Sequence, residues 1–190
     1  MSPILGSKGG ISASAYGLFG AAAGGANSYE SIQTVTVGSG GQASVTFSSI
    51  PSTYKHLQLR YIARASSADL VVFRVNGSTG NDYALHALQG NGSAASAVAT
   101  TSYSYGGVAP ISGTADTFGA GVLDILDYAN TNKYKTFRTL GGRDLNGSGI
   151  IELRSSLYMS TSAISSIVLS TDSVLNFQQY SSFALYGVKG

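Results

Sequence analysis

The chain has 190 residues, which is enough for one all-β domain and an additional segment. Charged residues make up only 11% of it, whereas helix-rich soluble proteins need more Lys, Glu and Arg, so the composition favours β structure with a surface partly covered by neighbours. The net charge of +2 argues against a nucleic-acid partner, and the absence of Cys excludes disulfides and thiolate zinc sites.

The first segment, residues 1–28, is rich in Gly, Ala and Ser and contains isolated large apolar residues. Its apolar surface is too small to offset the entropy of ordering it, so we expect order only when the segment docks on a partner. Glycines interrupt the apolar residues of this segment, which is atypical of a signal peptide. The segment is also too weakly apolar to form a membrane-spanning helix. We therefore predict no membrane insertion and a docking arm with the contact residues Ile4, Leu5, Ile11, Tyr16, Leu18 and Phe19.

From Tyr29 onward, short β-branched or aromatic runs alternate with turn-forming clusters, which indicates strands. The runs cover residues 32–37, 43–47, 56–64, 70–75, 83–89, 121–126, 134–140, 150–153, 164–169 and 182–188. Their spacing predicts that residues 29–190 form an all-β domain, an antiparallel two-sheet sandwich of jelly-roll type. The residues expected in the core are Leu57, Leu59, Tyr61, Phe73, Val75, Phe137, Ile167, Phe183 and Leu185.

Turn chemistry between these runs predicts hairpins. Asn-Gly-Ser occurs at residues 76–78, 91–93 and 146–148, and Asn-Gly supplies the two positive φ angles of a type I′ turn. We expect the Gly-rich residues 38–41 to join the first two strands in the same way.

Catalytic and cofactor motifs are weak. Only His56 and His86 could serve as imidazole bases, and no Gly-x-Ser-x-Gly motif accompanies them, so we predict no enzyme. Residues 90–95 match Gly-x-Gly-x-x-Ala but precede poor helix-forming sequence, which favours a loop over a dinucleotide site. Residues 144–148 alternate oxygen-bearing side chains but contain one carboxylate, which favours a turn over a calcium loop. We predict neither a metal nor another cofactor.

The twelve Tyr residues offer a further kind of site, because aromatic faces with a polar group suit sugars and protein interfaces. Tyr103 and Tyr105 are the best exposed candidates for surface recognition, for example of a host-surface glycan. A dedicated lectin site is disfavoured by the absence of Trp and would need a cleft with convergent aromatic and polar groups.

Four segments of the domain stand out, namely residues 28–32 (SYESI), 47–60 (FSSIPSTYKHLQLR), 123–130 (LDILDYAN) and 181–189 (SSFALYGVK). They resemble a family of short tail-fibre-like or uncharacterised virion proteins of bacteriophages, particularly aquatic ones. The resemblance implies a non-enzymatic virion structural protein, assembled in the host cytoplasm with other virion proteins. We expect a tail or fibre component that is attached by the arm and forms a homo-oligomer, with a trimer as one option. The alternatives are a capsid decoration protein and a carbohydrate-binding module.

Overall fold

The computed structural model describes residues 28–103 and 105–190. The predicted docking arm, with its six apolar contact residues, lies outside the described residues. Within them the chain forms twelve strands and contains no helix, and therefore no helix that could cross a membrane.

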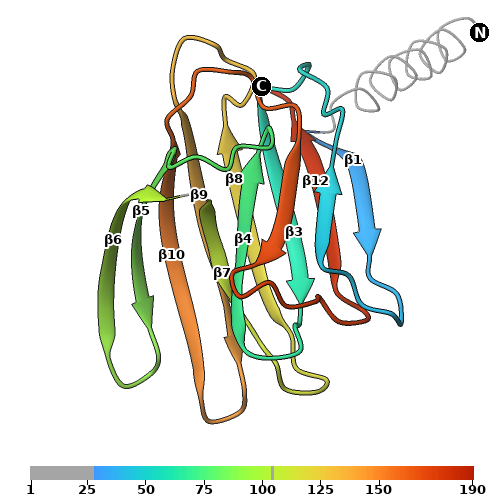
Figure 1. Cartoon of the computed structure of the whole chain (residues 1–190), viewed down its shortest axis with the longest axis vertical. Helices are drawn as coiled ribbons and strands as arrows, with labels where there is room; N and C mark the ends of the chain where they lie inside the picture. Colours follow the sequence, from blue (N-terminus) through green and yellow to red (C-terminus); the bar gives the residue numbers. More distant parts are fainter. Residues whose placement is uncertain (1–27, 104) are drawn as a thin grey trace, which may run out of the picture.

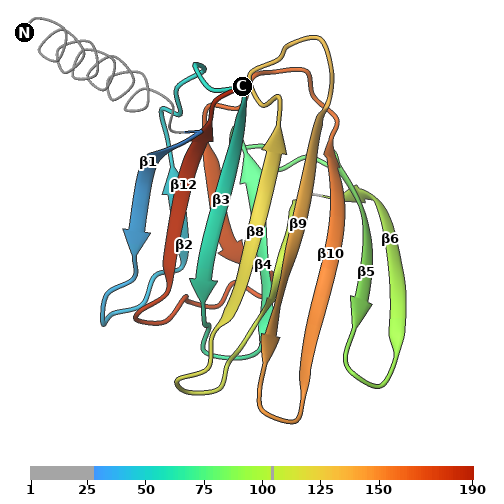
Figure 2. The same cartoon turned by 180° about the vertical axis from the view of Figure 1, so that it is seen from behind.

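The strands form two sheets, and all strand pairs are antiparallel (Figures 1 and 2). The large sheet has the order β1 (Tyr29–Thr36), β12 (Ser182–Val188), β3 (His56–Ala63), β8 (Gly119–Leu126), β9 (Lys135–Asp144), β10 (Gly149–Tyr158), β5 (Tyr83–Gly90) and β6 (Ala95–Tyr103). The small sheet has the order β2 (Ser44–Phe47), β11 (Ile167–Thr171), β4 (Asp69–Val75) and β7 (Gly106–Ile111). The predicted all-β architecture with two antiparallel sheets is confirmed.

The core lies between the two sheets and follows from the alternation of apolar residues. Leu57, Leu59 and Tyr61 of β3 point inward, and Arg60 and Ile62 point outward. All nine residues expected in the core are buried. Aromatic rings connect the sheets, for example Phe73 of β4 and Phe137 of β9, whose centroids are 4.7 Å apart.

The sheets differ in width, so the large sheet extends beyond the small one. The hairpin of β5 and β6 stands beyond β7, the last strand of the small sheet (Figure 1). The side chains of residues 95–99 in β6 are exposed on both faces, because no described strand of the small sheet packs against this part of the large sheet. The overhang leaves part of the inner face of the large sheet uncovered.

Two of the four predicted hairpins are correct, namely those at residues 91–93 and 146–148. The other two predictions are wrong, because the turns at residues 38–41 and 76–78 join strands of different sheets. Asn76 (φ 52°) and Gly77 (φ 67°) do form a tight turn. However, the Asn76 side chain donates to Ala163 O (2.8 Å) and accepts from Ser165 N (2.9 Å). These bonds hold the turn against the segment before β11. The chain after the turn then enters β5 in the large sheet and does not pair with β4.

Candidate functional site

A cleft of about 450 Å³ opens where the two sheets separate. The inner faces of β5, β6 and β10 form one side of it, and residues of β4 and β7 form the other. The lining residues that can bind a ligand by hydrogen bonds or ring contacts are Gln89, Thr100, Tyr103, Tyr105, Glu152 and Arg154.

The floor of the cleft holds a buried ion pair. Glu152 and Arg154 are two residues apart on β10, so both side chains point to the inner face. One oxygen of Glu152, Oε2, accepts from both Nε and Nη2 of Arg154 at 2.6 Å, and the two side chains are only 2% and 9% exposed. Within the described residues, no further bond occupies Glu152 Oε1 or Arg154 Nη1. The pair therefore retains an acceptor and donors for another molecule.

The strands beside β10 contribute glycines and a buried tyrosine hydroxyl group to the same row as Glu152. Tyr61, Gly121, Gly141 and Glu152 follow one another in register across β3, β8, β9 and β10. The Tyr61 ring lies over Gly121, where a Cβ atom would be 2.5 Å from the tyrosine oxygen. Burial raises the pKa of Tyr61, and its hydroxyl group has no hydrogen-bond partner within the described residues.

Tyr103 and Tyr105, the candidates from the sequence, lie at the mouth of the cleft and are half-buried rather than exposed. Their rings pack edge to face with centroids 4.4 Å apart. The Tyr105 hydroxyl group donates its hydrogen to Asp172, because a carboxylate can only accept. The Tyr105 oxygen can then accept a hydrogen bond from the Tyr103 hydroxyl group, 2.9 Å away. Burial, followed by the bond to Asp172, raises the pKa of Tyr105. Their role in recognition stays a prediction.

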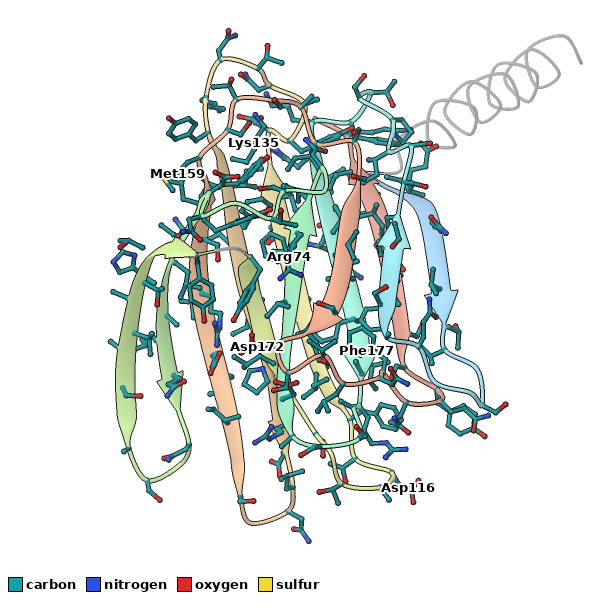
Figure 3. The ribbon with its side chains drawn as sticks, viewed as in Figure 1. Arg74, Asp116, Lys135, Met159, Asp172 and Phe177 are labelled. Carbon is teal, nitrogen blue, oxygen red and sulfur yellow. The ribbon has the colours of Figure 1, made fainter. Side chains whose placement is uncertain are left out.

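Residues of the small sheet contact Tyr105 and hold it in place. The guanidinium group of Arg74 on β4 lies 5.5 Å from the centre of the Tyr105 ring. Asp172 directly follows β11, and its backbone N donates to Leu70 O of β4 (3.0 Å). Figure 3 shows Arg74 and Asp172 over the small sheet. Tyr105 thereby fixes the end of β6 relative to β4 and β11.

The outer face of the large sheet is a second unusual surface, which we call the open face. Its outward residues form two mainly apolar rows in register across β3, β8, β9, β10 and β5, and the β3 position of the second row is the charged Arg60. The large apolar residues of these rows that are 48% to 60% exposed are Ile62, Leu88, Leu140, Ile151 and Leu153. Small residues, among them Ala120 and Gly142, leave a depression of about 920 Å³ in this face. Within residues 28–103 and 105–190, no strand covers this face (Figure 2).

The two histidines lie on strands separated by β8, β9 and β10. His56 Nδ1 accepts from the backbone N of Asp127 (2.9 Å), so it stabilises a turn. His86 is exposed on the open face. Asp144 accepts from Asn146 N (2.8 Å) within the turn predicted there, and the described residues contain no cluster of three or more potential metal ligands.

One buried lysine has a structural explanation. Lys135, at the start of β9, is fully buried, and Nζ donates to the backbone oxygens of Asn130, Lys133 and Thr161. It closes the loops at the end of the sandwich remote from Asp172 (Figure 3). Burial lowers its pKa, and its donors are used, so it is not a candidate nucleophile.

Sequence analysis did not identify the ion pair in the cleft, because alternation along β10 does not say which side of the strand faces the core. Ile151 and Leu153 point outward, and Glu152 and Arg154 point inward. Two opposite charges at positions i and i+2, between large apolar residues, were the available signal. A strand that buries its charged side and exposes its apolar side is unusual, and both sides are therefore candidate binding surfaces.

No protein-family model, curated protein or solved structure matches this chain.

Proposed function

We propose that the chain is a non-enzymatic structural component of a phage particle, in a tail or fibre assembly, and that it assembles as a homo-oligomer through the open face. The observation that carries this proposal is the pair of apolar rows on that face. Contiguous exposed apolar surface is rare in monomeric soluble proteins and marks interaction sites. A chain with few charged residues and a wide uncovered sheet suits a crowded assembly better than free solution.

The occupant of the open face is a second copy of the chain. The row beside the apolar rows carries both Asp124 and Arg138, which are register neighbours on β8 and β9. A two-fold axis between these strands would place Arg138 of one copy opposite Asp124 of the other. The three rows across the five strands measure roughly 24 Å by 20 Å, or about 480 Å² as a flat projection. This is more than half of the ~800 Å² that each partner contributes to a standard interface.

The strand order supports the finer fold assignment, a jelly roll with two inserted hairpins. Without β5–β6 and β9–β10, the sheets read β1-β12-β3-β8 and β2-β11-β4-β7. Numbered anew along the chain, these orders are 1-8-3-6 and 2-7-4-5, the arrangement of an eight-stranded jelly roll. Viral capsid and lectin domains share this arrangement, so the support for a virion role at this step is fold analogy.

Capsid decoration is the second candidate within the same class, since it would also need a self-associating surface and an attachment segment. The copy number per purified particle separates the two candidates. A number that matches the capsomers would indicate decoration, and a number that matches a tail tip or set of fibres would indicate the proposed role. Absence of the chain from purified particles would overturn both.

The open face is tested by sedimentation velocity of the full chain. The wild type should sediment as a dimer, which also separates the two-fold arrangement from the trimer considered above. Leu153→Glu places a charge in the centre of the apolar rows and should yield a monomer. Val174→Glu changes an apolar residue that is 81% exposed outside the large sheet and should leave the dimer unchanged. A monomeric wild type, or a dimer that Leu153→Glu leaves intact, would contradict the proposal.

A further inference from the structure

We propose that the cleft between the sheets is a saccharide-binding site, with Glu152 and Arg154 as its hydrogen-bonding floor and Tyr103 as the ring that a sugar packs against. This inference goes beyond the proposed role in assembly. It concerns the inner side of β10, whereas self-association uses the outer side.

The first argument is the position of the ion pair. Burying two charges costs several kcal/mol per ion in desolvation, and their mutual contact repays this only when the remaining donors and acceptors are satisfied. Here Glu152 Oε1 and Arg154 Nη1 have no partner within the described residues, and both residues line the cleft. An adjacent acceptor and donor match the vicinal hydroxyl groups of a sugar, because each hydroxyl can both donate and accept.

The second argument is the charge balance of the cleft. Its lining contains two carboxylates, Asp69 and Glu152, and two guanidinium groups, Arg143 and Arg154. Asp69 is occupied by the backbone N atoms of Leu70 (2.7 Å) and Ser173 (3.0 Å). Arg143 donates to Ile111 O (2.6 Å). The site therefore offers no net charge for a phosphate or a metal cation, and it suits a neutral polar ligand.

The third argument is the apolar part of the lining. Leu85 and Val98 of the large sheet and Pro110 of β7 line the cleft beside the Tyr103 ring. Sugar rings present C–H faces that pack against aromatic and aliphatic groups while their hydroxyl groups point elsewhere. The volume of about 450 Å³ falls in the range of small-molecule sites. The ligand is thus a short saccharide or the end of a longer one.

The aromatic wall is held in place before a ligand arrives. Tyr105 is anchored by Asp172 and packs edge-on against Tyr103. Tyr105 is therefore a positioning residue, which keeps the Tyr103 ring at the mouth of the cleft. A preorganised wall reduces the entropy lost on binding, which matters for weakly bound ligands such as sugars.

The experiment uses the full chain on an array of bacterial capsular and O-antigen oligosaccharides, followed by titration calorimetry with the strongest binder. Tyr103→Ala should weaken binding several-fold, and Tyr134→Ala, which removes an exposed tyrosine outside the cleft, should not. A single substitution of Glu152 or Arg154 leaves the other buried charge without its partner and can unfold the chain. The double variant Glu152→Leu with Arg154→Met replaces the pair by apolar groups, so it should remain folded and lose about tenfold or more in affinity.

Two results would overturn the inference. One is the absence of binding to the array. The other is a saccharide whose affinity is unchanged in both the Tyr103→Ala and the double variant, since it would then bind elsewhere. Both results are independent of the dimerisation test, because Leu153 lies on the opposite face of β10.

Discussion

Removing a single hydroxyl group, that of Tyr83, is expected to destabilise the sandwich without changing its apolar packing. Tyr83 begins β5 and is fully buried, and its hydroxyl oxygen accepts from the backbone N of Val75 (2.9 Å), the last residue of β4. The ring packs edge-on against Phe73 and stacks on Tyr158. Since Tyr83 pairs with Tyr103, this bond joins the two sheets at one end of the cleft.

The magnitude follows from what the substitution Tyr83→Phe leaves behind. Val75 is fully buried, so its N–H group would lose its partner without gaining water, at a cost of about 1 to 3 kcal/mol in the free energy of unfolding. Urea unfolding followed by circular dichroism measures this difference. The control is Tyr158→Phe, which removes a hydroxyl group with no hydrogen bond within the described residues and should change stability by less than about 0.5 kcal/mol. Equal losses in the two variants would refute the reasoning.

Burial of the same hydroxyl group leads to a prediction for alkaline pH. Burial is the main reason that the pKa of Tyr83 rises from 10.0 to about 12. A raised pKa in the folded state means that the neutral hydroxyl group stabilises the fold fully below about pH 10. This stabilisation is lost as the pH rises through about 12. The stability difference between wild type and Tyr83→Phe should therefore shrink over that range, and a difference that stays constant would contradict the assignment.

Three further predictions concern the acid limb, the core and the arm. Hydrogen bonds from Lys133 and then Lys55 lower the pKa of Asp127 from 3.8 to about 2, so its stabilisation is present above pH 3.8 and is lost as the pH falls through about 2. Asp127→Asn, which tolerates the φ of 48° there, should flatten the acid limb of stability measured by urea unfolding. Leu59→Ala should cost about 2 to 5 kcal/mol in calorimetry, because Leu59 is fully buried, and a loss below ~0.5 kcal/mol would contradict its placement. Deleting residues 1–27 should leave a folded sandwich that no longer joins phage particles, and normal incorporation would show that the sandwich itself carries the attachment.

The core could be predicted from the sequence where one face of a strand is apolar and the other polar. In β3, Leu57 and Leu59 alternate with Gln58 and Arg60, and the apolar residues are buried in the core. The sandwich follows from this pattern because a half-apolar sheet needs a second layer to cover it.

Two strands could not be predicted because their own residues do not specify them. The segment that forms β6 begins with small residues, its only large apolar residue before Tyr103 is Val98, and its single pairing partner in the described chain is β5. β7 contains Pro110 and two glycines, which are poor strand formers. Pro110 is tolerated because β7 is an edge strand, bonded on one side only, to β4. Missing these strands also made Tyr103 and Tyr105 look like an exposed loop.

The orientation of β10 could not be predicted from the periodicity of its residues. Alternation separates Ile151 and Leu153 from Glu152 and Arg154, but it does not say which side faces the core. That choice depends on what covers each side. Of the small sheet, mainly β7 packs against β9, β10 and β5, so the inner face of β10 is covered less completely than the core around β3.

The cleft and the open face have the same structural origin. The hairpins β5–β6 and β9–β10 widen one sheet to eight strands while the other keeps four, and this creates uncovered area on both sides of the added strands. If the hairpins served only to stabilise the sandwich, their large apolar residues would point inward, where burial contributes about 25 cal/mol per Å². Phe137 and Tyr83 do point inward, but Leu140, Leu153 and Leu88 point outward, and Glu152 and Arg154 occupy part of the inner side. These outward apolar and inward charged residues contribute little to folding stability, and the proposed contacts with a second copy and with a saccharide would account for them.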